Sequence, residues 1–534
     1  MARGLLGIAS AIALLTLLSK AFGFGRELVV AAVYGAGDAK DAYTAAYIIP
    51  AFSLILLGGL TGPFHTVTQK IITTLRTRSE DHEVPAVVAT ILVAVSAVMG
   101  LLAVGAYFGA PWLVRAVASQ LHQPAFELAI VQMRVMAPMI LIGGLVGVFC
   151  GISNDRGDYT LPSLSPLIAS LAIIGVILLQ PSPMALAWGT LLGAVGQFLL
   201  QAPAAWKLLR EGPPVFPLRF KHPEVIGMWG LLLPASVSST IGTLNVIIGT
   251  NFASSLPPGS MSVFDYANKL IQLPLGILMT ALLIPLFPMM TQAVVANDHD
   301  ALFGWMKKGL ETIALATIPL MALFVAAGEP TVSVLYERGA FTPEDTRMTY
   351  MVLAIGALGI FTYAARDLFI RVFYALHDSR TPLMVSLLSM AMTAGLMALL
   401  IGPFGLMGLA GATALVTVAN CLLVAFLLHR RLGRLALTGF FPFLLKVVVA
   451  ATLAAAASWG VGRWLNLPPS LIGNFVTMTL QTGVLALGYV GLLILFKVPV
   501  VEQVTAIAGR FRKKKIAPLP AAEDSASEPL QQAP

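Results

Sequence analysis

Three basic residues lie inside long apolar stretches of the sequence: Lys20, Arg26 and Lys269. Acidic residues accompany them, because Glu27 follows Arg26 directly and Asp265 lies four positions before Lys269. A charge at mid-bilayer costs at least about 2.5–3.5 kcal/mol, so such side chains should face a cavity or a partner. A cluster of cations with few acids selects an anion, and phosphates are the common biological choice.

The positions of the first two cations leave two interpretations open. Lys20 and Glu27 are seven residues apart and share a helix face, whereas Arg26 points elsewhere on a straight helix. Gly23 and Gly25 could bend the helix and turn both cations inward. In the alternative, the glycines only allow close helix packing and Arg26 reaches the outer interface.

Lys269 also has two interpretations. It could converge with the other two cations, or it could only form an ion pair with Asp265 on the same helix. The uncharged candidates Asn251 and Gln272 could line a wall of the same cavity, although such residues more often form interhelical hydrogen bonds. Further along the chain, we expect an Asp367–Arg371 ion pair.

The composition predicts that lipid surrounds these charges. Of 534 residues, 57% are hydrophobic and 11% are charged, and the mean hydropathy is +0.86. A soluble domain is about one quarter charged, and a span needs about 20 apolar residues. We therefore predict an all-α polytopic membrane protein with about fourteen spans. They lie near Ile8–Val33, Ala42–Val67, Pro85–Phe108, Phe126–Gly151, Leu161–Leu179, Met184–Trp206, Val225–Phe252, Phe264–Ala293, Trp305–Ala327, Met348–Tyr374, Pro382–Ile401, Leu406–Leu428, Phe443–Trp464 and Leu471–Phe496.

The basic residues indicate the orientation of the chain. A net charge of +8 would suggest nucleic acid in a soluble protein, but here the cations collect in short loops. With a cytoplasmic N-terminus, 21 of the 33 Lys and Arg lie on the cytoplasmic side and five outside: Lys40, Arg115, Arg338, Arg347 and Arg463. This asymmetry predicts cytoplasmic N- and C-termini and no nucleic-acid partner.

Enzyme chemistry has no recognisable site in the sequence. No Gly-rich phosphate loop ends in Lys-Ser or Lys-Thr, and no serine lies in a nucleophile elbow. Cys150 and Cys421 offer neither a disulfide framework nor metal-ligand spacing. We therefore expect no catalytic activity, no metal and no cofactor.

The chain also repeats itself. Asp41 precedes Pro50 by nine residues, and Asp265 precedes Pro274 by the same distance. A second match links Val148-Phe149, Asp155 and Pro162 with Val372-Phe373, Asp378 and Pro382. Chance similarity is the alternative, but two ordered matches favour two parallel six-helix lobes, a known transporter plan. The expected divisions are 1–222 (N-lobe), 223–436 (C-lobe), 437–500 (two extra helices) and 501–534 (a basic interfacial helix and a disordered tail).

Several segments together resemble a known family. Leu18-Ser-Lys-Ala-Phe-Gly-Phe-Gly-Arg-Glu27, Tyr34-Gly-Ala-Gly37 and Asp41-Ala-Tyr43 are similar to the N-terminal signature of the MurJ (MviN) lipid flippases. Tyr266-Ala-Asn-Lys-Leu270 and Asn154-Asp-Arg156 are similar to further family segments, as is Tyr336-Glu-Arg-Gly-Ala-Phe-Thr342. This family belongs to the multidrug/oligosaccharidyl-lipid/polysaccharide exporter superfamily.

The resemblance implies a fourteen-helix fold in a bacterial plasma membrane. It implies transport of lipid II, the undecaprenyl-pyrophosphate-linked peptidoglycan precursor, from the cytoplasmic to the outer leaflet. Lys20, Arg26 and Lys269 correspond to the family's basic residues, and Asp41 to its acidic residue after the Gly-Ala-Gly turn. Membrane lipids and cell-wall synthesis proteins are further expected partners, and a monomer is expected.

The sequence departs from the family pattern in its second span, which carries no charge before His65 where many members have an arginine pair. This departure is similar to a cyanobacterial branch and leaves open which groups replace the arginines. The expected mechanism is alternating access driven by the membrane potential. Two alternatives are a flippase for another polyprenyl-linked glycan of the O-antigen type and a non-transporting scaffold of cell-wall assembly.

Overall fold

The computed structural model describes residues 2–57, 62–211, 217–433, 437–465, 467–468 and 470–498. All regular elements in these ranges are helices. The predicted interfacial helix and tail in 501–534 lie outside the described residues.

The first half of the chain contains helices that match the predicted spans closely. The second predicted span is built from two α-helices with a π-helical turn between them, and the fourth from two consecutive helices. The elements are α1 (Ala2–Tyr34), α2 (Asp38–Ala51), η1 (Phe52–Leu57), α3 (Pro63–Thr77), η2 (Asp81–Glu83), α4 (Val84–Phe108), α5 (Ala110–Val117), α6 (Gln123–Met136), α7 (Met139–Asp155), α8 (Thr160–Leu179) and α9 (Ala185–Arg210).

The regular elements among the described residues of the second half are also helices only. Its elements are α10 (Pro223–Ala253), α11 (Ser260–Val295), α12 (His299–Ala326), α13 (Gly328–Tyr336), α14 (Pro343–Ala357), α15 (Ile360–Ala375), α16 (Arg380–Leu432), α17 (Phe440–Leu465) and α18 (Leu471–Leu495). Helix α16 contains a sharp break at Gly405, whose φ of 55° and ψ of −130° are not helical. This break separates the two spans that the sequence predicts there.

Length and hydropathy identify nine membrane-spanning helices among the described residues, or ten if the bent pair α14–α15 counts as one span. Helix α16 enters this count once although it turns back at Gly405. Large apolar side chains remain exposed on many helices, among them Leu179, Trp464 and Leu487. Exposure of so many large apolar side chains to water is unfavourable, so these helix faces are suited to contact lipid. The chain is a polytopic membrane protein.

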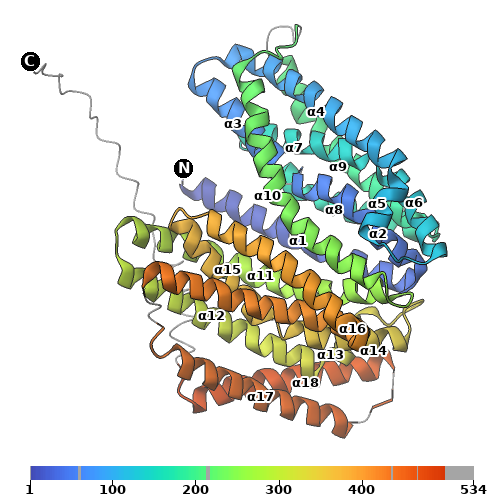
Figure 1. The fold of residues 1–534 in the computed structure, drawn as a ribbon, viewed down its shortest axis with the longest axis vertical. Coiled ribbons are helices and arrows are strands. Elements are labelled where there is room, and N and C mark those ends of the chain that lie inside the picture. Colours follow the sequence, from blue (N-terminus) through green and yellow to red (C-terminus); the bar gives the residue numbers. More distant parts are fainter. Residues whose placement is uncertain are drawn as a thin grey trace, which may run out of the picture.

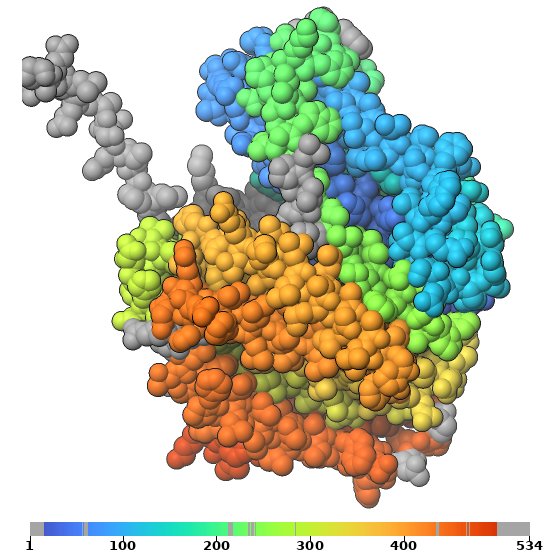
Figure 2. Space-filling model, in the orientation of Figure 1, coloured from blue at the N-terminus to red at the C-terminus, as the bar shows by residue number. Residues whose placement is uncertain are grey.

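The helices pack in two groups, which Figure 1 shows above and below α1. Helices α2 to α9 form one group and α11 to α18 the other, and α1 packs mainly against α8. Helix α10 runs between them, with its start against α3 and α4 and its later part against α16. The groups meet where α1 turns into α2 and diverge toward the other end, as the space-filling view also shows (Figure 2).

Candidate functional site

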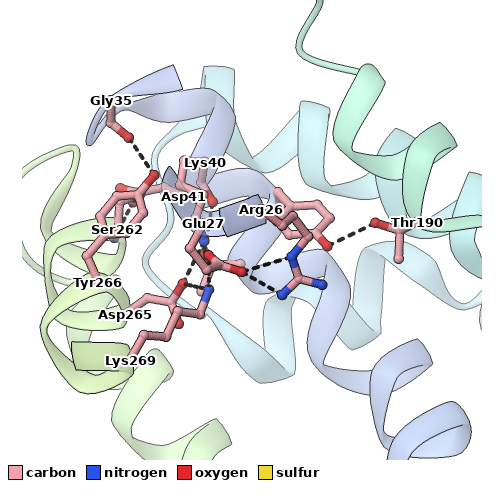
Figure 3. Close-up of polar contacts among 12 residues, drawn as sticks. Arg26, Glu27, Gly35, Lys40, Asp41, Thr190, Ser262, Asp265, Tyr266 and Lys269 are labelled. Carbon is pink, nitrogen blue, oxygen red and sulfur yellow. Dashed lines mark hydrogen bonds and ion pairs between the residues drawn. The ribbon is translucent and has the colours of Figure 1, made fainter. Parts of the chain in front are cut away.

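Five charged side chains form a continuous chain of ion pairs between α1, α2 and α11 (Figure 3). The Glu27 carboxylate accepts from Arg26 Nη2 and from Lys269 Nζ, each at 2.5 Å. One oxygen of Asp265, Oδ2, accepts from Lys269 Nζ at 2.8 Å and from Lys40 Nζ at 2.6 Å. The pairs therefore join the first group of helices to the second.

The local helix geometry explains how these residues meet. Asp265 and Lys269 are four residues apart on α11 and lie one above the other on the same face. Lys40 lies in the first turn of α2, beside the end of α1, and is 1% exposed. The side chains of Arg26, Asp265 and Lys269 are 23%, 25% and 30% exposed, so this part of the network is accessible to a ligand.

Asp41 has a different role in the geometry, although it is the neighbour of Lys40. Its carboxylate accepts from the amides of Gly259 (2.7 Å) and Ser262 (2.8 Å) and from the Ser262 hydroxyl (2.5 Å). These donors belong to the beginning of α11, where a helix presents unpaired amides and the positive end of its dipole. Asp41 thus ties α2 to the N-terminus of α11.

Main-chain contacts complete this junction. The Ala340 amide donates to the Ala32 carbonyl at 2.8 Å. Gly35 (φ 58°) and Gly259 (φ 87°) lie so near the carbonyls of Ala340 and Ala36, respectively, that a Cβ atom at either glycine would overlap them. The closely packed junction therefore depends on main chain as much as on side chains.

Asn251 lies at the same end of the molecule. Its amide donates to the Ala116 carbonyl at 3.2 Å, and its oxygen accepts from the Ser119 hydroxyl at 3.2 Å. Close by, the Gln120 amide donates to Ser254 Oγ. These bonds join the end of α10 to the end of α5 and the segment that follows it, so Asn251 helps to hold the two groups together.

A cavity of about 670 Å³ opens in the second group of helices. Its volume is in the range of small-molecule sites. Lys20 reaches it from α1, and its side chain is exposed. The polar lining consists of Lys20, Asn268, Gln272, Thr280, Tyr363, Asp367, Thr413 and Thr417.

The structure thus divides the residues proposed from sequence into three places. Lys20 and Gln272 line the cavity, Arg26 and Lys269 lie in the ion-pair chain, and Asp41 and Asn251 lie at the closed junction. The Asp265–Lys269 pair is present together with further partners rather than in place of them. The expected Asp367–Arg371 pair is confirmed, with 3.2 Å between Oδ2 and Nε.

Sequence reasoning missed Lys40, which it assigned to an outer loop. The signal was obscured because the predicted span begins only at Ala42, whereas α2 begins at Asp38 and carries Lys40 into the packed junction. Helix α1 also continues unbroken through Gly23 and Gly25. Arg26 comes to the network by pairing with its neighbour Glu27.

Comparison with known proteins identifies the family. A family model described as lipid II flippase MurJ matches residues 30–477. The chain belongs to the lipid II flippase MurJ family. A probable lipid II flippase MurJ from Synechocystis is 34% identical over 522 residues, which cover 94% of this chain and 96% of that protein. The lipid II flippase MurJ of Burkholderia cenocepacia is 30% identical over 467 residues, covering 84% and 88% of the two chains.

Solved structures agree with the MurJ family at the level of fold. An inward closed structure of a lipid II flippase MurJ has a TM-score of 0.74 at 19% identity, covering 91% of this chain and 98% of that one. An inward-facing multidrug transporter of the MATE family has a TM-score of 0.65 at 15% identity, covering 81% and 99%. The resemblance drawn from the sequence is confirmed, and the MurJ family consists of transporters rather than enzymes.

Proposed function

We propose that this protein moves lipid II from the cytoplasmic to the outer leaflet of a bacterial plasma membrane. Membership of the MurJ family supports this cargo. The observation that carries the proposal is the exposed Lys20 in a cavity of about 670 Å³, next to a network with more cations than acids. Such a site suits the diphosphate and sugars of a polyprenyl-linked precursor.

The proposed architecture has fourteen membrane crossings with both termini in the cytoplasm. Helices α1 to α9 form an N-lobe, α10 to α16 form a C-lobe with the same orientation, and α17 and α18 are added outside. The break at Gly405 and the matching positions of Asp41 and Asp265 support this division. With this orientation, the closed junction faces outward and the divergent ends of the lobes face the cytoplasm.

The transport cycle follows from this asymmetry. The cytoplasmic opening admits the headgroup to Lys20 and Gln272 in the cavity. The diphosphate then competes with Glu27 and Asp265 for Arg26 and Lys269. Since those acids hold the two lobes together, the competition weakens the outer closure and favours the outward-open state. Asp41 and Asn251 stabilise the closed junction when it forms again after release of the headgroup.

The polyprenyl tail stays in an apolar environment throughout. Helices α17 and α18 carry exposed apolar side chains, including Phe441, Leu445 and Leu487, and provide a surface for the tail. The membrane potential drives the charged headgroup outward, because about 2.3 kcal/mol per charge is gained for each 100 mV. Collapse of the potential should slow flipping in vesicles, and an unchanged rate would exclude this driving force.

Complementation of a strain depleted of its own lipid II flippase tests the cargo. The wild-type chain should restore growth, while K20A should not, although it inserts normally and is within about 0.5 kcal/mol of wild-type stability because Lys20 is exposed. K20R is the matched control and should retain function. Growth with K20A would favour a scaffold role, and failure of the wild-type chain together with rescue of an O-antigen flippase mutant would favour another glycan cargo.

A further inference from the structure

We propose that Lys40 supplies the net positive charge with which Arg26 and Lys269 bind an anionic headgroup, although Lys40 itself does not touch the ligand. The inference rests on the proposed function, since it names a positioning residue for the same diphosphate site. Lys40 would thereby replace the positive charge that is missing from the second predicted span, where no charge occurs between Asp41 and His65.

The surroundings of Lys40 are those of a buried cation. Its ammonium donates to Asp265 Oδ2 at 2.6 Å and to Thr44 Oγ1 at 3.1 Å. It also lies over the rings of Tyr43 and Tyr266, at 5.5 Å and 5.4 Å from their centroids. A carboxylate and two aromatic faces stabilise an ammonium ion, and with 1% exposure the side chain is out of reach of a headgroup.

The charges of the network decide what Lys40 contributes. Without it, the acids Glu27 and Asp265 would cancel Arg26 and Lys269, and the network would be neutral. With it, the network carries one net positive charge. The nearby Asp41 offsets that charge only in part, because the positive end of α11, whose amides bind its carboxylate, compensates some of the negative charge.

The location of Lys40 lets its charge act on the exposed cations. Lys40 and Lys269 both contact the same oxygen of Asp265, so their ammonium groups are neighbours. Because Lys40 competes with Lys269 for that carboxylate, Asp265 neutralises less of the Lys269 charge, and more of it acts on a ligand. Water and salt screen a buried charge much less than an exposed one, so the effect reaches the 30% exposed Lys269 side chain.

The same geometry separates this role from a structural one. If Lys40 only holds α2 against α11, a second substitution in the network should weaken ligand binding further. If Lys40 acts through its charge, its loss can be compensated by removing one acid, because this restores the net charge of the network. Glu27→Gln is the suitable second change, since Asp265 keeps its bond to Lys269.

The experiment measures equilibrium binding of undecaprenyl diphosphate and of inorganic pyrophosphate by the full-length chain in nanodiscs. Four proteins are compared: K40M (network charge zero), wild type (+1), E27Q (+2) and K40M/E27Q (+1). We expect binding at least about tenfold weaker for K40M than for wild type, tighter binding for E27Q, and near-wild-type binding for the double variant. K40R is the conservative control and should bind like wild type.

The outcomes distinguish the inference from the proposed function. If wild type binds neither probe, the proposed function fails first. If wild type binds and K40M binds equally well, or if the double variant binds more weakly than K40M, the charge-supply role of Lys40 is wrong. Should K40M not fold, tighter binding by E27Q together with wild-type binding by K40M/E27Q supports the inference, and weaker binding by both overturns it.

Discussion

Asp41 and Asp265 each lie nine residues before a proline, the spacing on which the predicted repeat rests, yet the structure uses them differently. Asp41 binds main-chain amides and a hydroxyl at the start of α11, whereas Asp265 binds two lysines. The first aspartate is held mainly by main-chain amides of a helix end, which a side-chain substitution there does not remove. The second depends on charged partners that single substitutions can remove. Two positions with the same sequence spacing can therefore carry one structural role and one electrostatic role.

The largest effect that this comparison predicts is for Asp265→Ala. The change leaves Lys40 buried without its carboxylate, and breaking a buried ion pair in this way costs about 3–5 kcal/mol. Thermal unfolding followed by tryptophan fluorescence in nanodiscs should show a correspondingly large fall in the midpoint. A fall no larger than that of an exposed substitution such as E344A would contradict the central place of Asp265 in the junction.

Asp41→Ala should cost less, about 2 kcal/mol, which is the upper range for the loss of a helix-capping side chain. The donors left behind are neutral amides rather than a buried charge, which explains the smaller loss. The same unfolding measurement should show lower stability. Disulfide cross-linking or spin-label distances across the junction should show that it opens more often. Stability equal to wild type would show that α11 does not need this cap.

The double variant K40M/D265A sharpens the comparison further. Because it removes both partners of the buried pair, its loss should shrink to about 1 kcal/mol. No equivalent rescue exists for Asp41, whose main partners are backbone groups. A double variant as unstable as D265A alone would mean that Lys269, rather than Lys40, is the partner that matters.

The smallest effect is expected at the second repeat match. Asp378 accepts bonds from the Thr381 amide and hydroxyl and from the Arg380 amide, which lowers the pKa of its carboxyl below the ordinary range. Its contribution to stability is therefore present above the unfolded-state pKa of about 3.9 and is lost as the pH falls through the lowered value. The difference in unfolding midpoint between wild type and D378N should shrink toward zero on acidification.

The sequence predicted the helices well because long apolar stretches mark most of the segments that are suited to cross lipid. It also pointed to Lys20, Arg26 and Lys269, which the structure places in the cavity and the ion-pair chain, since few charges are tolerated in such segments. It could not assign Lys40, because a charge at the edge of an apolar stretch is indistinguishable from a loop charge until its partner on α11 is known. Nor could it show that Asn251 bonds to Ala116 at the end of α5, a contact over 135 positions in sequence.

The main-chain contacts of the junction have a consequence for the speed of the proposed transport cycle. At Gly35 and Gly259 the two groups of helices touch through main chain, with no side chain between them. Closing such a contact orders no rotamers, so the conformational entropy lost at each return is small. In the proposed cycle the junction can therefore reform in the same way each time, and a single added methyl group at either glycine would prevent it from closing fully.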